Sequence, residues 1–268
     1  MAKEQGVNVV LNIFFGPAVN AARGIAYQVL GKLNGFVSNF QMAMNPQIIK
    51  NYASGELVSL YRLVFRGAKF SYLLLLTLSL PIVVEASLVL NLWLKDVPQF
   101  TVIFLQITIF TALINTLSNP LIITMHATGK VRDYQVVVGC LSLLTLPLVY
   151  ITLKLGAAPY MAMVIAFLVE LVCHFARLYM LVRSIDFPMV AFLRSVTLRM
   201  VLITIISLVL PAFAHQTIAI SSLRFIIVCI LSLMSTIGFG YYLGFNKADR
   251  NILRTKVATI VKTKILKR

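Results

Sequence analysis

Residues 97–129 read VPQFTVIFLQITIFTALINTLSNPLIITMHATG and contain no Asp, Glu, Lys or Arg. Further charge-free runs cover residues 134–153, 200–223 and 225–246. A transmembrane helix needs about 20 mostly apolar residues, because each residue rises about 1.5 Å across a hydrocarbon layer of about 30 Å. Runs of this length predict an all-α, polytopic membrane helix bundle, since membrane barrels are built from alternating segments of about ten residues.

The composition of the whole chain agrees with this fold class. Of its 268 residues, 60% are hydrophobic and only 12% are charged, and the mean hydropathy is +0.92. Soluble domains carry about 25% charged residues. The net charge of +16 could indicate a nucleic-acid partner. The basic residues flank apolar runs, however, so membrane orientation accounts for them and we expect no nucleic-acid binding.

Eight helical segments are predicted, of which about seven or eight lie in the membrane. The first contains only about ten apolar-rich residues and looks like the end of a longer helix. We expect one transmembrane bundle over residues 1–245 and a basic cytoplasmic tail over residues 246–268. The segments lie near residues 6–15, 18–46, 57–80, 98–126, 131–154, 158–184, 188–212 and 220–245, with a short apolar helix at 82–94 after Pro81.

The distribution of Lys and Arg predicts the orientation. Most of the 24 basic residues fall near the even-numbered connections or in the tail, whereas the odd-numbered connections carry only Lys95, Lys154 and Arg224. Lys and Arg concentrate in cytoplasmic loops. We therefore expect a multi-pass protein of the bacterial inner (cytoplasmic) membrane, in contact with membrane lipid, with a cytoplasmic C-terminus.

The segment at 18–46 is unusually polar for such a chain. At 100° per residue, one stripe within about 60° of Arg23 contains Asn20, Arg23, Tyr27, Asn34, Ser38, Gln41 and Asn45. Polar groups at membrane depth face the bundle interior and often mark a substrate path. Gly24, Gly31 and Gly35 form a neighbouring stripe that predicts close helix packing. Lys32 lies on the opposite side from Arg23, and snorkelling to the headgroups is the alternative interpretation of both cations.

A second polar group is Glu170, His174 and Arg177, whose spacing places them on one helix face. They could form an ion or proton relay, or an internal charge pair. Elsewhere, Glu85 is predicted to be an interfacial carboxylate, and His215 to be solvated in an outer loop. His126 is predicted to lie at a membrane boundary.

Nothing in the chain indicates an enzyme. It has eight acidic residues, no nucleophile–base set at a common depth and no phosphate-binding glycine loop. Cys140, Cys173 and Cys229 lie inside apolar runs without metal-ligand spacing, so we expect no metal and no cofactor.

Longer strings carry a family resemblance. FFGPAVNAARGIAYQV and NGFVSNFQMAMNPQIIKNYASGE, with LPIVVEASLVLNLWLKDVP and IITMHATGKVRDYQ, resemble the polysaccharide transporter family. Its lipopolysaccharide and O-antigen flippases belong to the multidrug-exporter-like (MATE-like) superfamily. The similarity covers nearly the whole chain but only the C-terminal half of the family pattern, in particular that of Bacteroides-type bacteria. It implies the second of two helical bundles around a central cavity.

This resemblance implies a function in lipopolysaccharide and O-antigen biosynthesis. The expected substrate is an undecaprenyl-pyrophosphate-linked oligosaccharide, and a missing N-terminal half is a further expected partner. Arg23 and Lys32 fit the anionic headgroup, with Asn20, Asn34, Ser38, Gln41 and Asn45 for sugar hydroxyls. Two alternatives stay open: an ion-coupled multidrug-exporter-like transporter, which predicts an acidic cavity, and a non-functional fragment of a flippase.

Overall fold

The computed structural model describes residues 2–219, 221–245 and 250, and these residues form helices and no strand. The predicted basic tail, residues 246–268, lies outside the described residues except for residue 250. Two segments are π-helical, η1 (Leu193–Thr197) and η2 (Gly240–Gly244). The α-helices are α1 (Ala2–Phe15), α2 (Pro17–Ala53), α3 (Leu57–Val84), α4 (Ala86–Trp93), α5 (Thr101–Ala127), α6 (Val131–Leu143), α7 (Thr145–Lys154), α8 (Met161–Ile185), α9 (Met189–Phe192), α10 (Leu198–Thr217) and α11 (Ser222–Phe239).

Six stretches of the described chain are long and apolar enough to cross a membrane, so the prediction of a multi-pass helical membrane protein is confirmed. They are Leu57–Val84, Thr101–Ala127, Val131–Lys154, Met161–Ile185, Met189–Thr217 and Leu223–Gly244. The number is lower than the seven or eight segments that we predicted. Helix α1, with 14 residues, is too short to span a bilayer. Helix α2 has 37 residues but is not among the apolar spans, because polar residues run along its whole length.

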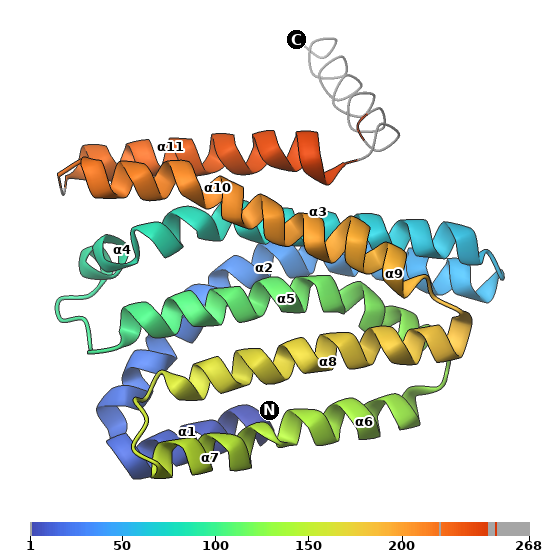
Figure 1. The fold of residues 1–268 in the computed structure, drawn as a ribbon, viewed down its shortest axis with the longest axis horizontal. Coiled ribbons are helices and arrows are strands. Elements are labelled where there is room, and N and C mark those ends of the chain that lie inside the picture. Colours follow the sequence, from blue (N-terminus) through green and yellow to red (C-terminus); the bar gives the residue numbers. More distant parts are fainter. Residues whose placement is uncertain (1, 220, 246–249, 251–268) are drawn as a thin grey trace.

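Helices α2 and α5 occupy the middle of the bundle (Figure 1). On one side, α3 packs against both and carries the α10–α11 pair on its far flank. On the other side, α8 packs against α5, and the broken helix α6–α7 packs against α8. Helix α1 lies against α7 and α2. The most polar of the long described helices is therefore covered on one side by α3 and α5, while its other side is exposed.

The connections segregate to the two ends of the bundle (Figure 1). The turns after α2, α5 and α8 lie together at one end. The turns after α1, α7 and α10, and the α4 region, lie at the other. These are the two sets that the Lys and Arg distribution separates, so the alternation predicted from charge agrees with the path of the chain.

Two prolines do not end helices where we expected. Helix α2 continues through Pro46 to Ala53, and α3 continues through Pro81 to Val84, with the break at Glu85. A proline removes one backbone N–H and disturbs only the preceding turn. Packing against neighbouring helices compensates for that loss in membrane bundles, which is why both helices persist.

A glycine outside the predicted stripe makes room for a side chain of α2. A Cβ atom on Gly67 of α3 would lie 2.1 Å from Met44 Cε of α2, so the end of the Met44 side chain packs directly on Gly67. A Cβ atom on Gly24, Gly31 or Gly35 would meet no atom within 4 Å. The prediction that this glycine stripe packs against another described helix is therefore wrong. The reason is that α3 and α5 cover the side of α2 that carries its apolar residues.

Candidate functional site

The site begins where α2 starts. Gly16 has φ 78°, a left-handed conformation that glycine adopts without strain, and Pro17 occupies the first turn of the helix. The chain thereby reverses between α1 and α2. This reversal places Asn8 of α1 beside the first turns of α2, where the Asn20 amide donates a 2.9 Å hydrogen bond to the Asn8 carbonyl.

The predicted polar stripe of α2 faces the bundle interior over most of its length. Arg23 and Gln41 are buried, and Asn20, Tyr27, Asn34 and Asn45 are half-buried, whereas Ser38 is exposed. Lys32 is exposed on the opposite side together with Gln28 and Asn39. Arg23 and Lys32 therefore do not share a surface, as the helical angles indicated.

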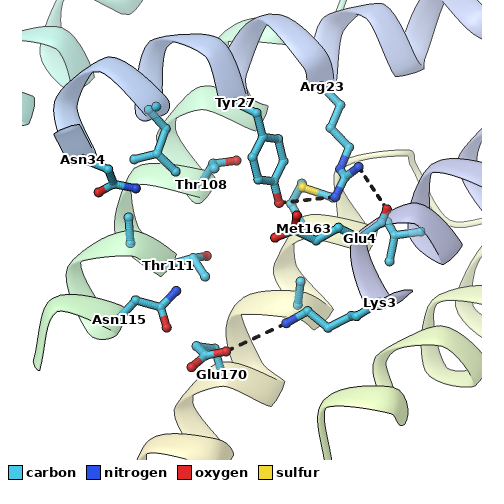
Figure 2. A pocket seen from close by; sticks show the side chains of 15 residues that line it. Lys3, Glu4, Arg23, Tyr27, Asn34, Thr108, Thr111, Asn115, Met163 and Glu170 are labelled. Atoms are coloured by element: carbon cyan, nitrogen blue, oxygen red, sulfur yellow. Dashed lines mark hydrogen bonds and ion pairs between the residues drawn. The ribbon is translucent and has the colours of Figure 1, made fainter. Parts of the chain in front are cut away.

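Four helices enclose a cavity of about 260 Å³ below Arg23, which we call the Arg23 cavity (Figure 2). Helix α2 contributes Arg23, Tyr27 and Asn34. Helix α5 contributes Thr108, Thr111 and Asn115, and Lys3 and Glu170 enter from α1 and α8. The cavity therefore presents hydroxyl, amide, cationic and carboxylate groups within an otherwise apolar bundle.

The Arg23 guanidinium is held by neutral groups. It donates to the Glu4 carbonyl (3.4 Å), to Asn8 Oδ1 and to the Tyr27 hydroxyl (3.3 Å). Its central carbon also lies 4.6 Å from the Tyr27 ring centroid, a cation–π contact. Arg23 is 4% exposed, and its Nε has no acceptor. Snorkelling to the headgroups is therefore wrong for Arg23, because its guanidinium is bound inside the bundle.

A second cavity of about 240 Å³ continues from the first. It shares Asn34 and Asn115 with the Arg23 cavity and adds Ser38 and Gln41 of α2. The Gln41 side chain donates to the Thr116 carbonyl at 3.4 Å. The two cavities together follow the α2–α5 interface for about five helical turns of α2, from Arg23 to Gln41, and about three turns of α5, from Thr108 to Asn119. The predicted stripe residues Asn20 and Asn45 line neither of them.

Helix α5 forms the side of this path that faces α2, and its polar residues were not predicted from the sequence. Thr108, Thr111, Asn115 and Asn119 of α5 line the two cavities. Their spacing places them on one helix face, at angles within about 80° of one another. The same angular analysis that identified the α2 stripe would therefore have identified these residues.

The predicted cluster on α8 contains an internal ion pair. Arg177 Nη1 lies 2.6 Å from Glu170 Oε1, both side chains are buried, and the Tyr134 hydroxyl accepts from Arg177 Nε at 3.3 Å. His174 does not join this pair; its Nδ1 lies 2.8 Å from the Ser118 hydroxyl. The three residues are thus not a linear relay. The alternative that we considered, an internal charge pair, describes the geometry of Glu170 and Arg177.

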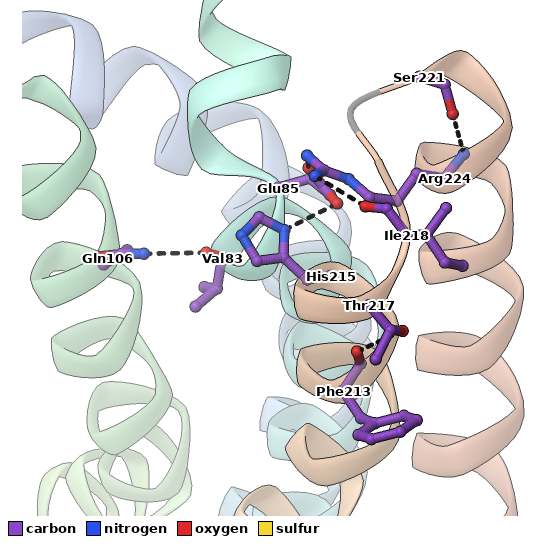
Figure 3. Close-up of polar contacts among 9 residues, drawn as sticks. All are labelled: Val83, Glu85, Gln106, Phe213, His215, Thr217, Ile218, Ser221 and Arg224. Carbon is purple, nitrogen blue, oxygen red and sulfur yellow. Dashed lines mark hydrogen bonds and ion pairs between the residues drawn. The ribbon is translucent and has the colours of Figure 1, made fainter.

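A third polar cluster ties the ends of three helices together (Figure 3). Glu85, between α3 and α4, accepts from Arg224 of α11 (2.7 Å) and lies 3.0 Å from His215 Nδ1 of α10. Glu85 is 1% exposed. Glu85, predicted to lie at the membrane interface, is buried in this contact between helices. The prediction of a loop position for His215 is wrong, because His215 lies in the last turn of α10, although its side chain is 41% exposed. His126 ends α5 and is exposed, as a boundary residue would be.

Among the described residues, no group of three or more His, Cys, Asp or Glu side chains could hold a metal ion. The three cysteines are unpaired, and Cys173 is buried while Cys140 is exposed. Comparison with known proteins identified no matching family model, no matching curated protein and no matching solved structure.

Proposed function

We propose that the chain is the C-terminal bundle of a bacterial inner-membrane transporter that moves a lipid-linked oligosaccharide between leaflets. The supporting observation is the outward side of α2. Gln28, Lys32 and Asn39 are exposed there, beside the exposed Gly24, Gly31 and Gly35. Amide and ammonium groups are costly in lipid, so this side would border water or another polar surface. A path for a polar headgroup would be lined by exposed amide and ammonium groups of this kind.

The residue types on this side fit the expected substrate. Lys32 supplies a positive charge for a pyrophosphate or an acidic sugar, and Gln28 and Asn39 supply donors and acceptors for sugar hydroxyls. No carboxylate lies on α2. An exporter of small cations would need an unpaired carboxylate in its cavity, whereas the buried carboxylate of the Arg23 cavity, Glu170, is paired with Arg177. For this reason we favour a glycan transporter over that alternative. The exposed side of α2 would then face the N-terminal bundle that the resemblance implies.

Replacing Lys32 with alanine should reduce surface glycan roughly tenfold or more, because a hydrogen bond to a charged group contributes about 1.5–3 kcal/mol. The variant would be expressed in a strain that lacks the chromosomal gene, and surface glycan would be quantified by immunoblotting. Lys154→Ala, an exposed cation at the end of α7, is the matched control. Normal glycan in the Lys32 variant would rule out a headgroup contact at this residue.

Orientation has a separate test. A reporter that is active only outside the cytoplasm should remain silent when fused after Arg268, and should be active when inserted after Gly156, between α7 and α8. The connections after α2, α5 and α8 carry the excess of Lys and Arg that is typical of cytoplasmic loops. We therefore expect the connection that contains Gly156, at the other end of the bundle, to lie outside the cytoplasm. The reverse pattern of activities would overturn the proposed topology.

A further inference from the structure

The Arg23 cavity contains more positive than negative charge. Lys3, Arg23 and Arg177 line it or lie beside it, and Glu4 and Glu170 are the carboxylates there. Arg177 already pairs with Glu170 at 2.6 Å, whereas Lys3 reaches the same carboxylate only at 3.8 Å. Glu4 is exposed. Three cations against two carboxylates leave one positive charge without a partner.

Arg23 is the cation with the least compensation. Within the described part of the chain, no carboxylate lies within 4 Å of its guanidinium, and all of its hydrogen-bond partners are neutral. The side chain is 4% exposed, and Nε has neither an acceptor nor solvent contact. Burying an uncompensated charge costs several kcal/mol. A bound anion would remove this cost.

The surroundings of Arg23 suit a small anion. The Tyr27 hydroxyl lies at 3.3 Å from the guanidinium, and Thr108, Thr111 and Asn115 face it across the cavity (Figure 2). The Tyr27 hydroxyl and the Asn115 amide can donate hydrogen bonds to an anion, whereas the Thr108 and Thr111 hydroxyls already donate to the Phe104 and Ile107 carbonyls. The cavity volume of about 260 Å³ has room for an inorganic ion together with part of its hydration shell.

From this geometry, we propose that the Arg23 cavity is a binding site for one small monovalent inorganic anion, of the size of chloride or nitrate. Arg23 provides the principal charge and Lys3 the second. The site is centred on the interior side of α2, and Lys32, on the opposite side, does not line it. Gly31 borders both the cavity and the exposed side of α2. The inference does not depend on what the protein transports.

Chloride binding to the purified full-length chain in detergent micelles tests this proposal. Bound chloride broadens the ³⁵Cl resonance of the bulk ion, so the excess line width measures occupancy even at millimolar affinity. We expect an excess that nitrate displaces. Arg23→Gln should weaken chloride binding about tenfold or more, because a hydrogen bond to a charged group is lost. Lys154→Gln, far from the cavity on the exposed end of α7, should retain the wild-type excess.

Two further measurements keep the outcome decisive. If Arg23→Gln does not fold, Lys3→Gln should still reduce the excess line width, since it removes the second cation. Inorganic pyrophosphate, a probe for the carrier headgroup, should not compete with chloride. Absence of a displaceable chloride signal, or an unchanged signal in both variants, would overturn the proposal. Competition by pyrophosphate would also overturn it and would assign Arg23 to the transported headgroup instead.

Discussion

Replacing Arg177 with methionine is expected to lower the free energy of unfolding by about 3–5 kcal/mol, because the change leaves the buried carboxylate of Glu170 without its close partner. The two groups lie 2.6 Å apart, and both side chains are less than one-tenth exposed. The remaining cation, Lys3, is 3.8 Å from Glu170 and cannot replace a direct charge-assisted hydrogen bond. Tyr134 would also lose its contact with Arg177 Nε.

Thermal unfolding of the purified protein in detergent measures this effect. Arg183→Met is the matched control, because Arg183 lies on the same helix but is exposed. A double variant, Glu170→Leu with Arg177→Met, removes both buried charges together. Buried ion pairs can often be replaced by apolar residues at little cost, so the double variant should recover most of the lost stability. Equal melting temperatures for Arg177→Met and the wild type would contradict a buried pair.

The apolar runs of the sequence were sufficient to predict the class of fold. Residues 97–129 and the other charge-free stretches overlap helices that are long and apolar enough to span a membrane, because length and hydropathy alone decide whether a helix can cross lipid. The positions of the ends were less predictable. Pro46 and Pro81 are poor helix residues in isolation, yet both lie inside helices since tertiary packing outweighs their local cost.

The candidate site was predictable where it depends on a single helix. Helical angles alone placed Arg23 and Lys32 on opposite sides of α2 and aligned Arg23 with Tyr27 and Asn34. Features that depend on two or more helices were not predictable. No periodicity within α2 shows that its partners cover the apolar side and leave Gly31 exposed. Nor does spacing along the chain show that Glu85 meets Arg224, which is 139 residues away.

This contact between Glu85 and Arg224 leads to the second large effect. Helices α10 and α11 pack against each other and, among the other long helices, chiefly against α3. Most of their outward side chains are large and apolar, including Ile205, Phe213 and Ile230. Glu85 therefore joins a peripheral pair of helices to the α3–α4 bend through one buried carboxylate (Figure 3).

Glu85→Ala is expected to destabilise the protein by about 3–5 kcal/mol, because it leaves the Arg224 guanidinium buried without a carboxylate. The Arg224 side chain is 8% exposed and lies 2.7 Å from Glu85 Oε2. His215→Ala should cost less than about 1 kcal/mol, since the His215 side chain is 41% exposed and water can replace its contact. Glu56→Ala, an exposed carboxylate at the opposite end of α3, is the matched control.

The destabilisation by Glu85→Ala should affect α10 and α11 more than the rest of the bundle. Amide hydrogen exchange measured by mass spectrometry should increase in α10 and α11, which lose an attachment to α3, before it increases in α5 and α8. The apolar replacement Glu85→Met with Arg224→Met should restore slow exchange, because it removes both buried charges together. Uniform acceleration across all helices in Glu85→Ala would mean that the contact supports the whole bundle, and would contradict a local attachment of the α10–α11 pair.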